Sequence, residues 1–200
     1  MVSDMPPGFD RAVRELTAEK LPPAFWAFHE QHYGIYKEYA VLQLDDATWA
    51  GQVVHEVMMS LAFNWNWLMM QASPARVAWS VLRITLAEQL RRNRRQRAFV
   101  ASATFRRAAL AALDELDALR SAFAAVESDL GLYAAISRLP ERQYDVIVLQ
   151  YVLDTPPHRV ASIMGVSQPT VRTHRRLARA KLALELGIDI TEETTDDRDE

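Results

Sequence analysis

The stretch from residue 159 to residue 181 is rich in hydrogen-bond donors and contains no acidic residue. Arginine and lysine bind phosphate oxygens, and Arg, Gln, Ser and Thr also hydrogen-bond the edges of bases. The candidate contact residues are Ser167, Gln168, Thr170, Arg172, Thr173, Arg175, Arg176 and Arg179. Because no carboxylate is present to repel a phosphate backbone, this pattern predicts a surface that binds nucleic acid.

Local signals place these donors on the second helix of a helix-turn-helix. Gly165 suits the left-handed residue that closes a helix, and Ser167 can cap the helix that follows. Pro169 then falls in the first turn, where a missing N–H is tolerated. We expect Thr155 to cap the first helix in the same way, immediately before Pro156 and Pro157.

The apolar residues of this segment have the spacing that a helix-turn-helix requires. Ala161 must be small where the two helices cross, Gly165 must turn sharply, and Val171 must fill the space between the helices. The alternative is an ordinary helical hairpin with a solvated basic face. Turn residues, core spacing and the absence of acids all favour the nucleic-acid interpretation.

The composition of the whole chain favours an all-α fold with enough apolar material for a core. Of its 200 residues, 50% are hydrophobic, only 6 are Gly and 9 are Pro, and none is Cys, which excludes disulfides and thiolate metal sites. The net charge of −3 conceals an acidic end, residues 185–200, in which Arg198 is the only base. The N-terminus lacks the pattern of a secretory signal, and the longest apolar stretches are too short to span a bilayer. We therefore expect a cytoplasmic protein without membrane insertion.

Hydrophobic periodicity divides the chain into segments. Helices are expected over residues 9–20, over 24–44, from a cap at Asp45 or Asp46 to Trp65, and from Pro74 to about residue 95, with a loop over residues 64–74. Short helices separated by prolines and Gly165 follow residue 130. The predicted organisation has two small helical domains joined by a helical linker. Its parts are a lead-in at 1–22, a first domain at 23–97, the linker at 98–129, a second domain at 130–186 and an acidic, disordered tail at 187–200.

Three strings in this sequence resemble a known family. LPERQYDVIVLQYVLDTPPHRVASIMGVSQPTVRTHRRLARAKLALEL, residues 139–186, resembles region 4 of the extracytoplasmic-function (group 4) sigma factors of bacterial RNA polymerase. AGQVVHEVMMSLAFNWNW, residues 50–67, resembles region 2.2 of that family, and PARVAWSVLRITLAEQLRRNRR, residues 74–95, resembles regions 2.3–2.4. The strings follow the order of the family, and the pair of regions in series is more specific than region 4 alone.

The resemblance implies that the first domain holds polymerase core and the melted promoter strand, while the second reads the upstream promoter element. Aromatic rings stack on unpaired bases, at about 1–3 kcal/mol per base, and arginines hold phosphates. The implied region 2 DNA contacts are Trp65, Trp67, Trp79, Arg83, Arg91, Arg92, Arg94 and Arg95. Met69 and Met70 would complete the base pocket. Trp79 lies inside a predicted helix and is equally compatible with packing in the core. For the arginine block, the alternative is a solvated face.

The implied polymerase-binding residues are Gln52, His55, Glu56 and Met59. Here the chain departs from the family, which usually has an acidic pair followed by Gln in region 2.2. Gly51, Gln52 and His55 stand at the matching positions, and Glu56 alone keeps its acid. The departures leave DNA contact better supported than polymerase contact.

Three functions remain open. The first is a sigma-like initiation factor that binds core polymerase and promoter DNA, with an anti-sigma factor as a further possible partner. The second is a DNA-binding regulator without productive core binding. The third is a protein-interaction module. Neither His29-Glu30 with His32 nor His55-Glu56 forms the zinc-binding pair of histidines four residues apart, and no phosphate loop or nucleophile motif is found. We therefore expect no enzyme activity, no metal and no cofactor.

Overall fold

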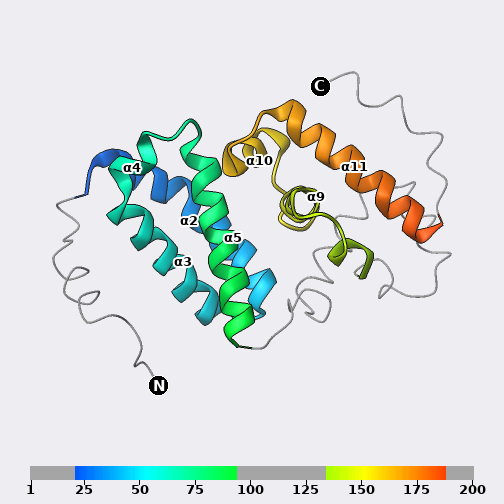
Figure 1. Cartoon of the computed structure of the whole chain (residues 1–200), viewed down its shortest axis with the longest axis horizontal. Coiled ribbons are helices and arrows are strands. Elements are labelled where there is room, and N and C mark those ends of the chain that lie inside the picture. The colour runs from blue at the N-terminus through cyan, green and yellow to red at the C-terminus, as the bar shows by residue number, and fades with distance from the viewer. Residues whose placement is uncertain (1–20, 94–133, 188–200) are drawn as a thin grey trace.

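The computed structural model describes residues 21–93 and 134–187 (Figure 1). Its first half, residues 21–93, contains α2 (Pro23–Leu44), α3 (Ala47–Phe63), α4 (Trp65–Met69) and α5 (Pro74–Arg92). Its second half, residues 134–187, contains α9 (Glu141–Ile147), the π-helical turn η3 (Val148–Val152), α10 (Pro157–Met164) and α11 (Gln168–Leu186). Within these two ranges there is no strand. The expected all-α class is confirmed.

Several expectations concern parts of the chain outside the described residues. These are the helix at 9–20, the linker at 98–129 and the tail beyond residue 187. The domain boundaries drawn from the sequence stay predictions.

Helices α3 and α5 begin where the sequence predicts. The Asp46 carboxylate accepts hydrogen bonds from the backbone N–H groups of Thr48 and Trp49, both at 2.9 Å, and so caps α3. Pro74 occupies the first turn of α5. Helices α2, α3 and α5 pack around a common apolar centre that includes Tyr36 and Leu82, both fully buried.

The expected loop over residues 64–74 is wrong in its first part. Residues Trp65–Met69 form α4, a five-residue helix that follows α3 after a break at Asn64. The alternation of Trp with Asn indicated a loop. Burial of Trp65 and Leu68 on one side instead stabilises a helical turn there, although isolated turns of this length are not stable in water.

The helix-turn-helix forms as the turn chemistry predicts. Gly165 closes α10 in the left-handed conformation, with φ 61°. The Ser167 side chain accepts a hydrogen bond from the Thr170 backbone N–H at 3.3 Å and so caps α11. Ala161 and Val171 are buried where α10 and α11 meet.

Thr155 does not cap α10, and this expectation is wrong. The N-cap position is held by Pro156 in extended conformation, while the Thr155 hydroxyl donates to the Leu153 carbonyl at 3.2 Å. The reason is the preceding turn: the backbone N–H of Thr155 donates to the Leu149 carbonyl at 3.0 Å, which ties this residue to η3. The π-helical turn itself carries no signal that sequence periodicity detects.

The two halves share one continuous hydrophobic core among the described residues. Helix α10 packs against α5, and in Figure 1 α11 lies beyond α10 as seen from α5. The surface of α11 that faces away from its own core is consequently open to solvent. This places the candidate donors of the second half at the edge of the molecule.

Candidate nucleic-acid interface

Helix α11 presents five of its eight predicted contact residues at exposed positions. Its opposite face packs against α9 and α10 through Val171, Ala178 and Leu182. The exposed members of the predicted set are Ser167, Gln168, Arg172, Thr173 and Arg176, and the half-buried members are Thr170, Arg175 and Arg179. An exposed helix with this donor set has the shape and chemistry to enter a major groove.

The start of α11 is held rigidly by its own polar residues. The hydroxyls of Ser167 and Thr170 lie 2.8 Å apart, and the Thr173 hydroxyl donates to the Pro169 carbonyl at 3.0 Å. Thr173 is thus satisfied locally, whereas Gln168 and Arg172 extend from exposed positions. Because the first turn is already ordered, less conformational entropy is lost when the helix binds a partner.

The three tryptophans of the predicted region 2 site lie in different environments. Trp65 is only 6% exposed, with its ring edge-on to Phe25 and Phe28 at centroid distances of 5.4 and 5.6 Å. Trp79 is fully buried. Trp67, in contrast, is 53% exposed. Of these rings, Trp67 alone is accessible to a base in this arrangement.

Trp67 borders a shallow apolar hollow between α3, α4 and α5. The hollow has a volume of about 280 Å³. It is lined by Ser60, Leu61, Asn64, Trp67, Leu68, Val77 and Val81. Met69, the last residue of α4, and Met70, which follows it, are also exposed. An open apolar site beside an exposed ring is suited to a flat, partly hydrophobic ligand such as an unstacked base.

The arginines predicted for region 2 separate into two groups. Arg91 and Arg92 are exposed at the end of α5, where both form ion pairs with Glu88, at 3.8 and 3.3 Å. Arg83 points toward the second half and is bound there. Arg94 and Arg95 lie outside the described residues.

The predicted polymerase-binding residues share one outer face of α3. Gln52, His55 and Glu56 are exposed, and Met59 is half-buried. The Gln89 side chain donates to the Glu56 carboxylate at 3.5 Å, which links this face to α5. The face is accessible to a partner, and Glu56 is its single acid.

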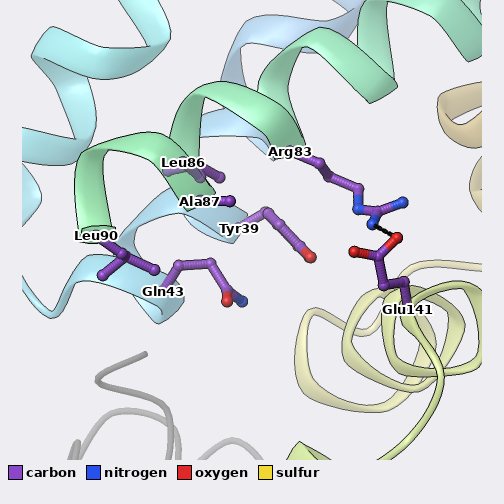
Figure 2. A pocket seen from close by; sticks show the side chains of 7 residues that line it. All are labelled: Tyr39, Gln43, Arg83, Leu86, Ala87, Leu90 and Glu141. Atoms are coloured by element: carbon purple, nitrogen blue, oxygen red, sulfur yellow. Dashed lines mark ion pairs between the residues drawn. The ribbon is translucent and has the colours of Figure 1, made fainter. Parts of the chain in front are cut away.

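A buried polar cluster between the halves was not found from the sequence. The Asp145 carboxylate, 1% exposed, accepts hydrogen bonds from the Tyr39 hydroxyl at 2.8 Å and from the Trp79 indole N–H at 3.1 Å. The Arg83 guanidinium lies 3.3 Å from the same carboxylate and also pairs with Glu141. Figure 2 shows Arg83 of α5 and Glu141 of α9 reaching toward each other, with Tyr39 and Gln43 beside them.

Burial has the largest effect on the pKa values of Asp145 and Tyr39 in this cluster. It raises the pKa of Asp145, an effect that the Arg83 charge and the two hydrogen bonds oppose. Burial, together with the neighbouring Asp145 charge, also raises the pKa of Tyr39 well above its ordinary value. The Tyr39 phenol therefore remains a donor. One signal was present in the sequence: Asp145 is the only charged residue between Tyr144 and Val152, in an otherwise mostly apolar run.

Residues 21–93 and 134–187 contain no group of His, Cys, Asp or Glu side chains arranged to hold a metal ion. Among the same residues, none of the helices has the length and hydropathy needed to cross a membrane.

Comparisons with known proteins assign the second half. Residues 130–182 match the family described as Sigma-70, region 4. The comparison with curated proteins finds no match. Among solved structures, the chain is similar to the sigma factor RpoE from Bartonella quintana, determined in complex with the anti-sigma factor NepR. The identity is 15% and the TM-score 0.42, over 84% of this chain and 99% of that one.

The matched segment contains α9, α10, the turn at Gly165 and most of α11. The resemblance to sigma-70 region 4 seen in residues 139–186 is thereby confirmed. Over residues 130–182, which include the turn of the helix-turn-helix, the chain is similar to the family described as Sigma-70, region 4.

Proposed function

We propose that the protein is a transcription initiation factor of the extracytoplasmic-function sigma class, acting in the cytoplasm. In this proposal it binds RNA polymerase core, recognises a promoter through α11 and stabilises the melted strand at the first half. The observation that carries the proposal is the region 4 match on a helix that is basic and contains no acid from Gln168 to Lys181. No covalent chemistry is involved.

Each half has a separate task in this proposal. Helix α11 enters the major groove, where Arg172 and Arg176 reach base edges or phosphates. The hollow beside Trp67 takes an unstacked base of the melted strand, and Arg91 and Arg92 hold phosphates nearby. The outer face of α3, with Gln52 and Glu56, contacts polymerase core. An anti-sigma factor remains a further proposed partner.

A second candidate is a DNA-binding regulator without productive core binding. It is favoured by the outer face of α3, where Gly51, Gln52 and His55 stand in place of the acidic pair and the following Gln that are usual in the family. Gel filtration of the protein with purified core polymerase separates the two candidates. The sigma proposal expects co-elution, whereas a footprint on duplex DNA without co-elution supports the regulator.

The neighbouring residues Trp65 and Trp67 allow a matched test of base capture. Trp67→Ala is expected to weaken single-strand binding by the core complex by about 1–3 kcal/mol, roughly 5- to 150-fold, without changing thermal unfolding. Trp65→Ala removes a buried ring and is expected to lower the free energy of unfolding by about 3–5 kcal/mol. Fluorescence anisotropy with a single-stranded oligonucleotide and circular dichroism measure the two effects. Unchanged single-strand binding by the Trp67→Ala variant would exclude the proposed base site.

A further inference from the structure

One border of α11 carries a histidine that lies outside the predicted set of contact residues. Val171 and Ala178 are buried on this helix, whereas Arg172 and Arg176 are exposed. His174 is three residues after Val171 and four residues before Ala178, so it lies beside the buried side of the helix. The residue is half-buried at this position, between the core of the second half and the solvent.

The two borders of the buried side of α11 carry different charged residues. Helical spacing places Arg172, Arg175 and Arg179 along one border. It places Thr170, His174 and Lys181 along the other, which we call the histidine border. The major groove is about 12 Å wide and a helix with its side chains is about 10–12 Å across, so a helix in the groove has phosphates on both sides. One border would meet them with arginines, and the other with a group that titrates near neutral pH.

Helix α9 packs against α11 and adds a positive charge near the histidine border. The Arg142 Nη1 atom of α9 is covered by protein and has no hydrogen-bond partner among the residues that the structure describes. Partial burial, and next the Arg142 charge, lower the pKa of His174, an effect that the Asp145 carboxylate opposes. The His174 imidazole is therefore neutral in the free protein at neutral pH.

The other ionisable groups on the helices packed here are Glu141 of α9, His158 and Arg159 of α10, and Arg175 and Lys181 of α11. Arginine and lysine keep their charge between about pH 5 and 8. Glu141 pairs with Arg83 of α5, and His158 is exposed on α10. On the histidine border, His174 is consequently the group whose charge changes in this range.

We infer that His174 binds a backbone phosphate of the DNA along the histidine border of α11 and takes up one proton from solvent when it does so. The negative phosphate favours the imidazolium form, whose N–H then donates to a phosphate oxygen. Arg142 acts through His174, because its charge keeps the imidazole neutral until a phosphate is near. The inference rests on the proposed function, since it requires α11 to lie in the groove. It adds that promoter affinity falls as the pH rises.

Titration of a labelled promoter duplex with the full chain bound to core polymerase, from about pH 5.5 to about pH 8, tests this inference. The parent is expected to lose about tenfold in affinity across the range, because a rise of about one unit in the pKa of His174 on binding corresponds to that factor. His174→Gln gains no charge and should keep the weaker, high-pH affinity throughout. His174→Lys is charged throughout and should keep the tighter, low-pH affinity.

His158→Gln is the matched control, because it removes an exposed histidine from the other helix of the same helix-turn-helix. It should show the pH dependence of the parent. Arg142→Gln removes the charge that keeps His174 neutral, and should move the midpoint of the affinity loss to higher pH. A purely structural effect of Arg142→Gln would lower the affinity without moving this midpoint. Circular dichroism at each pH checks that the helices stay folded.

Salt dependence distinguishes a phosphate contact from a general effect of pH. The logarithm of the affinity falls with the logarithm of the salt concentration, with a slope of about −0.9 for each phosphate that is neutralised. The slope of the parent should be steeper at low pH than at high pH, by about one such contact. The slopes of His174→Gln and His174→Lys should be the same at both pH values.

The possible outcomes separate this inference from the proposed function. If the parent binds the promoter and both His174 variants keep its pH dependence, the inference is overturned and the proposed function stands. Loss of the pH dependence in His158→Gln instead would overturn it in the same way. The His174→Lys result decides the question if His174→Gln fails to fold. Absence of promoter binding by the parent complex at every pH would contradict the proposed function, and the inference with it.

Discussion

Replacing Arg172 and Arg176 together by alanine is expected to lower promoter affinity by about 2 kcal/mol or more, roughly 30-fold. Both side chains are exposed on the open face of α11. Each arginine that forms a bidentate contact with a base contributes about 1–3 kcal/mol of discrimination. Titration of a labelled promoter duplex and of a scrambled duplex, at one fixed salt concentration, measures the loss. The loss should be larger for the promoter.

The matched control removes two positive charges elsewhere. Lys37→Ala combined with Arg138→Ala changes the net charge equally, but Lys37 lies on α2 and Arg138 pairs with Glu185 at the far end of α11. This pair should reduce affinity slightly and to the same extent for both duplexes, through long-range electrostatics. If the Arg172 and Arg176 variant behaves like this control, α11 does not read the promoter. Full activity of the Arg172→Ala, Arg176→Ala variant would favour the alternative that the protein is a protein-interaction module.

Gly165→Ala is expected to separate the two halves, whereas Gly187→Ala is not. A Cβ on Gly165 would lie 2.2 Å from the Arg76 backbone nitrogen and 2.7 Å from the Arg76 Cα, atoms that cannot move without shifting α5. A Cβ on Gly187 would meet nothing within 4 Å. Both glycines have positive φ, 61° and 68°, so both changes carry a similar backbone cost of about 1 kcal/mol. The difference between them isolates the contact of the turn with α5.

The two glycine variants are compared by thermal unfolding and by the distance between spin labels attached at Glu38→Cys on α2 and Leu184→Cys on α11, both exposed positions. Gly187→Ala should keep the distance of the parent and show a small loss of stability. Gly165→Ala should widen the distance, because separation relieves the overlap with Arg76, and should lower the unfolding temperature further. Equal behaviour of the two variants would mean that the Gly165 turn does not dock tightly on α5 in solution.

Local chemistry explains what could be predicted from the sequence. A left-handed closing residue, a Ser cap and a first-turn proline act within a few residues of one another, so Gly165, Ser167 and Pro169 identify the helix-turn-helix without knowledge of the rest of the fold. The same holds for Asp46 at the start of α3. The exposed face of α11 then follows from helical periodicity.

What could not be predicted depends on contacts between distant residues. Tyr39 and Trp79 meet Asp145 across 106 and 66 positions of sequence, and no local pattern relates them. The same packing decides that Trp65 is buried and Trp67 exposed, although both follow an Asn. The position of Thr155 before two prolines predicts a helix cap, but the turn after η3 determines its role instead. For Trp65, Trp67 and the Asp145 cluster, tertiary packing overrides local preference, whereas Thr155 is held by a turn within six residues of it.

Reconstituted transcription tests the central claim most directly. Purified RNA polymerase core, a promoter fragment selected by this protein and nucleotides are combined with and without the protein, and the transcripts are mapped. We expect synthesis from one discrete start site only when the protein is present, and its loss in the Arg172→Ala, Arg176→Ala variant. Failure of the protein to associate with core, or equal transcription without it, would contradict its proposed role as an initiation factor.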